Sequence, residues 1–347
     1  MTNWVSTWFY TQSKREGGRY AQVRGDSSTE KFRDVYRRCV GVFFLSARKA
    51  NPDAELVLYL NTPWDRHSSK VGAEVWLLLQ QLNVNVEVID YGHRPPDSFA
   101  QSWQNQFFVL DVLSDLEKKV RRSDAWVVLD SDIVWSTQST SSMWNTLQER
   151  GTSTYTVGYA PSKQVNGMSL ESLTSLAESA GLVLQDRLDY SGGEFVGGNG
   201  SSITDLVTRS HAIWSVLMEQ HEADNSIQFE EAHLLSVAYA VLGVSPGGMN
   251  SYVRRLWTQP FKYQNVTTED VELTLWHVPA EKKYGIRRLY RLAPKTHQPI
   301  LEMDYSHWII QCRKQLGIPR NSLFKVARDT ARAIQYRGVA EFARLRP

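Results

Sequence analysis

Two carboxylates stand close together inside an apolar stretch, at Asp130 and Asp132 of residues 126–135. The apolar residues around them predict a buried parallel strand that presents both acids at its carboxyl edge. Because like charges at this spacing repel, they must be solvated or neutralised, and a divalent cation is a suitable occupant. The stretch therefore indicates a metal site, against the alternative of an exposed turn with two acids.

A histidine far along the chain could complete the ligand set. His277 ends a stretch of β-forming residues, and Lys282, Lys283 and paired arginines follow it. Neutral imidazole is a ligand for Mn²⁺, and the cations suit a diphosphate. The alternative is a histidine with a purely structural role.

Glycines are dense in residues 190–200, where Gly192 and Gly193 precede Glu194. Glycines at this density in a strand mark bulges or let a ligand lie close to the backbone. We predict a hairpin-like segment here, with a ligand floor or a tight surface turn as the two interpretations.

A pair of acids, Glu230 and Glu231, opens an apolar helix predicted over residues 228–243. The helix dipole explains acids at this end in part. One of the two could point into a cleft while the other points to solvent.

Strands and helices alternate along the chain before and around these side chains. The hydrophobic pattern predicts strands over residues 4–10, 55–61, 84–89 and 126–135, with helices over 29–50, 73–82 and 99–117 between them. This βαβ order favours a parallel sheet with right-handed crossovers, so the predicted fold class is α/β.

Composition sets broad limits on function. The chain has 347 residues, is 42% hydrophobic and carries a net charge of +2, which argues against bulk nucleic-acid binding. Two cysteines are too few for a disulfide framework, and we find neither a signal-peptide pattern nor an apolar run of membrane length. We therefore expect a cytoplasmic protein, or one peripheral to the inner face of the membrane.

Several common motifs of parallel-sheet enzymes are missing from the sequence. No G-x-G-x-x-G follows the first predicted strand, and there is no Walker loop, H-E-x-x-H or G-x-S-x-G. The commonest rival uses of such a sheet are thereby disfavoured.

The order of these motifs over residues 4–290 resembles that of GT-A glycosyltransferases, which bind nucleotide-sugars with an Asp-x-Asp motif. His277 with a nearby lysine is similar to the late histidine and lysine of glycogenin-like members, although the Gly-x-Lys-Pro-Trp ending of that subgroup is missing. The resemblance implies a GT-A catalytic domain over residues 1–290. A mainly helical, basic extension over residues 291–347 would pack on it.

The resemblance also implies roles for individual residues. Asp132 and His277 would bind Mn²⁺ or Mg²⁺ directly, and Asp130 would contact the ion or the ribose. The expected donor contacts are Tyr10, Arg15, Asn105, Gln106, Asp130, Ser131, Gly192, Gly193, Lys282 and Lys283. The residues expected at the reacting centre are Glu231, Glu230 and Glu194, with Glu231 preferred over Glu230 as general base or positioning group and Glu194 accepting from sugar hydroxyls.

The implied function is transfer of a sugar from a nucleotide-diphosphate sugar, with UDP as the expected nucleotide, to an acceptor hydroxyl. The acceptor would be a glycan, a lipid-linked molecule or a small molecule in cell-surface glycan, glycolipid or glycoconjugate synthesis. Two alternatives stay open. One is a haloacid-dehalogenase-like phosphatase with Asp130 as nucleophile. The other is a non-catalytic carbohydrate-binding protein on a transferase fold.

The C-terminal segment is basic, and its pattern predicts one or two amphipathic helices over residues 321–346. Such a helix could dock on an anionic membrane surface. The alternative is a helix packed on the catalytic domain with a solvated basic face.

Overall fold

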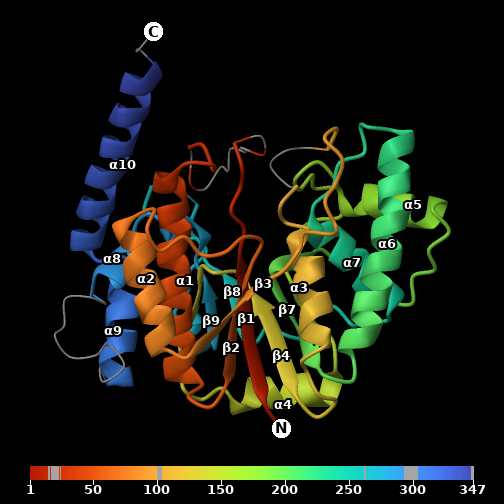
Figure 1. The fold of residues 1–347 in the computed structure, drawn as a ribbon, viewed down its shortest axis with the longest axis horizontal. Coiled ribbons are helices and arrows are strands. Elements are labelled where there is room, and N and C mark those ends of the chain that lie inside the picture. The colour runs from red at the N-terminus through yellow and green to blue at the C-terminus, as the bar shows by residue number, and fades with distance from the viewer. Residues whose placement is uncertain are drawn as a thin grey trace.

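The computed structural model describes residues 1–14, 16, 23, 25–99, 104–261, 263–292 and 304–344 of the chain. A central sheet carries helices on both faces (Figure 1). Its strands, in spatial order, are β3 (Val84–Val88), β2 (Glu55–Leu60), β1 (Asn3–Phe9), β4 (Ala125–Leu129), β7 (Ser191–Asn199) and β6 (Ser153–Thr156).

The sheet is mostly parallel. Strands β3, β2, β1 and β4 pair in parallel, whereas β7 runs antiparallel to both of its neighbours, β4 and β6. The predicted α/β class with a mostly parallel central sheet and flanking helices is therefore confirmed.

Alternate residues of each central strand feed two separate cores. In β2, Leu56 and Leu58 pack into the core on one face of the sheet, and Val57 and Tyr59 pack into the core on the other. This follows from the two-residue period of a strand, which sends successive side chains to opposite faces. Because both faces are covered, the strand has no polar face, as its continuous apolar run indicated.

The helices divide between these two cores. Helices α1 (Glu30–Ala50) and α2 (Lys70–Gln81) lie on one side, while α3 (Phe108–Glu117), α6 (Ile203–Ala223) and α7 (Glu231–Val241) lie on the other (Figure 1). Helix α1 begins where the sequence predicts, because the Thr29 side chain caps it by accepting from the Phe32 amide. The remaining helices are α4 (Ser141–Arg150), α5 (Leu170–Ser179), α8 (Gly285–Leu292), α9 (Tyr305–Leu316) and α10 (Leu323–Arg344), with short 3₁₀ turns at Glu269–Glu272 and Pro279–Glu281.

A second sheet contains β5 (Ile133–Trp135), β9 (Leu275–His277) and β8 (Val253–Arg255), in the order β5-β9-β8. The predicted single strand over residues 126–135 is therefore wrong in one respect. It breaks at Asp130–Asp132, because the chain leaves the first sheet there and enters the second. The two acids occupy the turn between the sheets.

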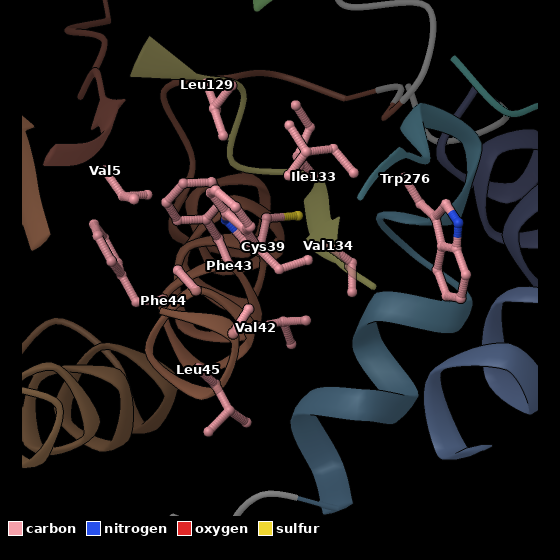
Figure 2. Packing of buried hydrophobic residues seen from close by; sticks show 14 of the residues in the cluster. Val5, Cys39, Val42, Phe43, Phe44, Leu45, Leu129, Ile133, Val134 and Trp276 are labelled. Carbon is pink, nitrogen blue, oxygen red and sulfur yellow. The ribbon is translucent and has the colours of Figure 1, made fainter. Parts of the chain in front are cut away.

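Helix α1 packs against strands of both sheets and anchors this turn. Figure 2 shows Phe43 and Cys39 of α1 near Leu129 at the end of β4 and near Ile133 at the start of β5. The Trp135 amide of β5 donates to the Ser46 hydroxyl of α1 at 3.1 Å. The apolar sequence on either side of the acids thus anchors the turn at both ends.

Two further predictions need correction. The helix predicted over residues 99–117 begins at Phe108 among the described residues, because residues 104–107 form turns. The glycine-dense segment is one antiparallel strand, β7, rather than a hairpin.

The C-terminal segment contains helices, as predicted. Helix α8 packs against α1 and α9, and α10 extends away from the rest of the molecule at its far end (Figure 1). Among the described residues, no helix is both long enough and apolar enough to span a membrane. The division into domains at residue 290 and the membrane contact of the basic C-terminus stay predictions.

Candidate active site

Backbone pairing brings the distant histidine to the acids. His277 lies opposite Ile133 in the β5–β9 ladder, and the Val278 amide donates to the Asp132 carbonyl at 3.2 Å. Asp130 closes the turn, since its carbonyl accepts from the Ile133 amide at 3.0 Å. The second sheet is therefore what joins the predicted ligands, although 145 positions separate Asp132 from His277.

Asp130, Asp132 and His277 form a compact ligand group. One ligand atom from each residue lies within 4.8 Å of the other two. His277 Nε2 is 3.1 Å from Asp132 Oδ2 and 3.6 Å from Asp130 Oδ2. Two carboxylate oxygens and one imidazole nitrogen are a donor set that suits Mn²⁺, and Mg²⁺ would accept the oxygens.

Asp130 and Asp132 differ in how closely protein cations contact them. Burial and the Asp132 charge raise the pKa of Asp130 to about 6. Burial also disfavours ionisation of Asp132, but Lys282, 2.6 Å away, and His277 outweigh it and hold the pKa of Asp132 well below its usual range. Among the described residues, Asp130 forms an ion pair only with His277, at 3.6 Å, so a bound cation would stabilise its charged form.

The histidine is itself strongly influenced by the acids. Burial opposes its charged form, yet Asp132 and Glu194 raise the pKa of His277 to about 9. Without a bound cation, the His277 imidazolium lies between Asp132 and Glu194, and the Lys282 ammonium pairs with Asp132. The predicted ligands therefore fit a metal ion in both chemistry and charge.

A cavity of about 440 Å³ opens beside the ligand group. The predicted site residues that line it are Tyr10, Asn105, Gln106, Asp130, Ser131, Asp132, Gly193, Glu194, Glu230, Glu231, His277 and Lys282. Gly192 and Lys283 are not among its lining residues, and Arg15 lies outside the described residues. The structure thus gathers most of the predicted site around one cavity.

The two adjacent lysines diverge. Lys282 points to Asp132 and the cavity, whereas the Lys283 ammonium donates to the Val23 carbonyl and lies 4.5 Å from the centre of the Tyr336 ring of α10. The short 3₁₀ turn at Pro279–Glu281 precedes them. Lys283 therefore joins chain segments in this structure, and its predicted donor contact stays a prediction.

The two glutamates at the start of α7 also differ. The Glu230 carboxylate accepts from the Tyr190 hydroxyl and, at 2.6 Å, from Asn166 Nδ2. Glu231 Oε2 has no hydrogen-bond partner among the described residues, although the atom is buried. Burial, with the charges of Glu230 and Asp130, raises the pKa of Glu231 well above its usual range. Of the two, Glu231 is the carboxyl with an unused oxygen at the cavity.

Gly193 makes room for Glu231. A side-chain carbon at Gly193 would lie 2.5 Å from Glu231 Oε1, closer than real contacts allow. The glycine in β7 therefore lets the carboxyl of α7 approach the strand. This contact agrees with the interpretation that the glycines permit close approach.

Several cavity residues carry no recognisable signal in the sequence. Arg255 of β8 pairs with Glu194, and Tyr190 and Asn166 hold Glu230. The paired Arg254 and Arg255 are visible in the sequence, but no spacing links them to an acid 61 positions earlier. Both Glu194 oxygens accept hydrogen bonds inside the protein, so its predicted contact with sugar hydroxyls stays a prediction.

Comparison with known proteins adds solved structures of similar fold. No family model and no curated protein matches the sequence. The chain is similar to the galactosyltransferase LgtC in complex with donor and acceptor sugar analogues, at 13% identity and a TM-score of 0.44 over 90% of this chain and 95% of that chain.

It is also similar to an active-site mutant of LgtC, at 14% identity and a TM-score of 0.43 over 80% of this chain and 86% of that one. A third similar structure is the bifunctional glycosyltransferase WbbM, at 11% identity and a TM-score of 0.47 over 80% of this chain and 45% of that one. All three are glycosyltransferases. Identities and TM-scores this low carry no argument about this chain, so its function has to be argued from the site.

Proposed function

We propose that this chain is a metal-dependent glycosyltransferase that moves a sugar from a nucleotide-diphosphate sugar, UDP-linked, to an acceptor hydroxyl. The observation that carries the proposal is the group Asp130, Asp132 and His277 at the edge of a cavity, with Lys282 beside it. The acceptor would belong to a glycan, a glycolipid or another glycoconjugate.

Mn²⁺ or Mg²⁺ held by Asp130, Asp132 and His277 would offset the negative charge of the departing nucleoside diphosphate. The Lys282 ammonium donates to Asp132 and would add a second positive charge near the diphosphate. Tyr10, Asn105, Gln106, Ser131 and Gly193, which line the cavity, would contact the rest of the donor.

Glu231 would act where the sugar is transferred. In the reaction the acceptor oxygen bonds to the anomeric carbon, the bond from that carbon to the diphosphate oxygen breaks, and the acceptor hydroxyl loses its proton. A half-buried carboxyl with a raised pKa and an unused oxygen is suited to take that proton or to position the reacting groups. Glu230 is engaged by Tyr190 and Asn166, which favours Glu231 for this role.

The phosphatase alternative is not favoured. Asp130 follows β4, the fourth strand in chain order, whereas the haloacid-dehalogenase-like pattern places its nucleophile after the first strand. We therefore do not assign Asp130 as a nucleophile.

A panel of nucleotide-sugars tests the proposal. We expect one of them, with Mn²⁺, to raise the unfolding temperature and to be slowly hydrolysed. A ligand at about 100 times its Kd stabilises a protein by about 2.7 kcal/mol. Asp132→Ala should remove the Mn²⁺-dependent part of both signals while circular dichroism shows that the variant stays folded.

Lys314→Ala is the matched control, because this lysine of α9 is exposed and is not among the residues that line the cavity. It should keep the Mn²⁺-dependent signals. If Asp132→Ala responded to Mn²⁺ and nucleotide-sugar at full strength, the proposal would be wrong.

A further inference from the structure

A buried ion pair lies directly behind the histidine. Arg255 donates to both oxygens of Glu194, from Nε at 2.8 Å and from Nη2 at 2.6 Å. The Glu194 side chain is 1% exposed and that of Arg255 is 18% exposed. This two-point contact fixes the plane of the carboxylate as well as its place.

Glu194 also contacts the imidazole of His277. Glu194 Oε1 is 3.1 Å from Nδ1 of the ring, while Nε2 on the other side faces Asp132 Oδ2 at 3.1 Å. A carboxylate can only accept, so the contact requires a proton on Nδ1. A neutral ring held in this way keeps its lone pair on Nε2, on the side of the two aspartates.

Glu194 also contacts Asp130, a second predicted metal ligand, through its backbone. The Glu194 carbonyl accepts from the Asp130 amide at 3.1 Å, in line with the β4–β7 ladder. Gly192 is required for this arrangement, because a side-chain carbon there would lie 2.1 Å from Glu194 Oε2. Glu194 thus contacts two of the three predicted metal ligands. Its side chain contacts His277, and its backbone carbonyl contacts Asp130.

Arg255 is fixed in turn by the surrounding elements. It lies opposite His277 in the β8–β9 ladder, its amide donates to the Tyr155 hydroxyl at 2.9 Å, and Nη1 donates to the Tyr159 hydroxyl at 3.3 Å. The chain of contacts therefore runs from β6 through Arg255 and Glu194 to His277.

Stability alone gives little reason for this pair. Taking a carboxylate and a guanidinium out of water costs free energy, and a well-packed apolar pair of similar size is often as stable or more stable. A buried ion pair in contact with a predicted metal ligand therefore indicates a role in positioning.

We propose that Arg255 and Glu194 are positioning residues that set the orientation and the Nδ1–H tautomer of His277, and that the cation affinity of the site depends on them. The inference rests on the proposed metal role of Asp130, Asp132 and His277. Groups that orient a metal-binding histidine from behind typically contribute about 10–100-fold to metal affinity.

The test measures Mn²⁺ affinity of the full chain by titration calorimetry, with no nucleotide or sugar present. Glu194→Gln keeps the shape but removes the charge, and we expect Mn²⁺ binding weakened by about 10-fold or more. The double variant Glu194→Leu with Arg255→Met replaces the ion pair by apolar groups, so it should stay folded and still bind Mn²⁺ about 10–100-fold more weakly. Urea unfolding in the absence of metal checks that stability is retained.

Arg254→Met is the matched control. Arg254 is the neighbour of Arg255 in β8 but pairs with Asp270, at 2.9 Å, away from the ligand group. Its loss should leave Mn²⁺ affinity unchanged. With the diamagnetic ion Zn²⁺ bound, ¹⁵N spectra of His277 should report a neutral ring protonated on Nδ1 in the wild type and lose that signature in the double variant.

The outcomes separate this inference from the proposed function. Wild-type Mn²⁺ affinity in a stable double variant, with affinity lost in Asp132→Ala, would overturn the positioning role and leave the proposed function intact. A wild-type chain that binds no Mn²⁺ would overturn the metal role and this inference together.

Discussion

Two buried clusters of charge in this molecule have opposite characters. The helix cluster joins α10 to α8 and to the 3₁₀ turn before Lys282, and contains Glu281, Lys325, Asp329 and Arg288. The site cluster contains Asp130, Asp132, His277, Lys282 and Glu194 and lines the cavity.

The helix cluster is closed. Lys325 lies between Glu281 and Asp329, at 2.9 and 2.8 Å, and Arg288 also pairs with Asp329. Glu281 and Asp329 are 0% exposed. Every acid there has a protein cation, so the charges serve only to join α10 to the rest of the structure.

The site cluster is incomplete. Although 38% of the Asp130 side chain is exposed, partial burial and the charge of Asp132 raise its pKa to about 6, and His277 at 3.6 Å is its ion-pair partner among the described residues. Among the described residues, only Asp130, Asp132 and His277 have the geometry to hold a metal ion. The comparison shows that buried charge alone does not indicate a functional site, whereas a weakly paired acid beside a cavity makes one a candidate.

The largest expected effect lies in the helix cluster. Lys325→Met leaves Glu281 and Asp329 without their shared cation, and removal of one partner from a buried ion pair typically costs about 3–5 kcal/mol. Urea unfolding should show a loss of that order, with Lys314→Met, an exposed lysine of α9, close to wild type. A loss below about 1 kcal/mol, the range of exposed ion pairs, would mean that Lys325 is not an essential partner of the two buried acids.

Asp130→Asn should weaken Mn²⁺ binding without lowering the stability of the fold. It removes a repulsive charge, so stability should stay equal or rise by up to about 1 kcal/mol after solvent screening. Mn²⁺ affinity should fall by at least about 10-fold, since a ligand contributes no less than the groups behind it. Calorimetric titration and urea unfolding check the two parts, with the exposed Asp97→Asn as control. Clear destabilisation together with unchanged Mn²⁺ affinity would reverse the contrast between the clusters.

A smaller, pH-dependent effect is expected at the start of α7. The Glu230 amide donates to His233 Nδ1 at 3.0 Å, and burial lowers the pKa of His233 to about 4. The unfolded chain takes up the proton near pH 6.5 and the folded chain only near pH 4, so this histidine destabilises the fold progressively as pH falls between those values.

His233→Gln removes the titration but keeps an acceptor for the same amide, as in a capping box. The fall in unfolding free energy between pH 7 and pH 5 should therefore be smaller in the variant than in the wild type. Urea unfolding at both pH values measures it, and an equal fall in the two proteins would argue against this assignment.

Local sequence pattern predicted the main architecture and the core of the site. The alternation of apolar strands and helices was enough for the parallel part of the sheet, and the paired Asp130 and Asp132 were visible because their charges conflict with an apolar strand. His277 was singled out by the basic run that follows it and by its place in the order of motifs that the family resemblance implies. These features are local in sequence, so they can be recognised without the fold.

Features that depend on distant contacts could not be predicted. The break at Asp130–Asp132 was hidden because apolar residues continue on both sides, although they belong to two sheets. Arg255 and Glu194 meet only through the pairing of β8 with β9 and of β4 with β7. The divergence of Lys282 and Lys283 depends on backbone direction after a short 3₁₀ turn, which residue types alone do not specify.

The turn between β4 and β5 has a mechanical consequence. Because Asp130 and Asp132 follow the end of one sheet and His277 belongs to the other, an ion shared by these side chains would cross-link the two sheets at the mouth of the cavity. Metal loading would then rigidify the angle between the sheets in addition to neutralising charge.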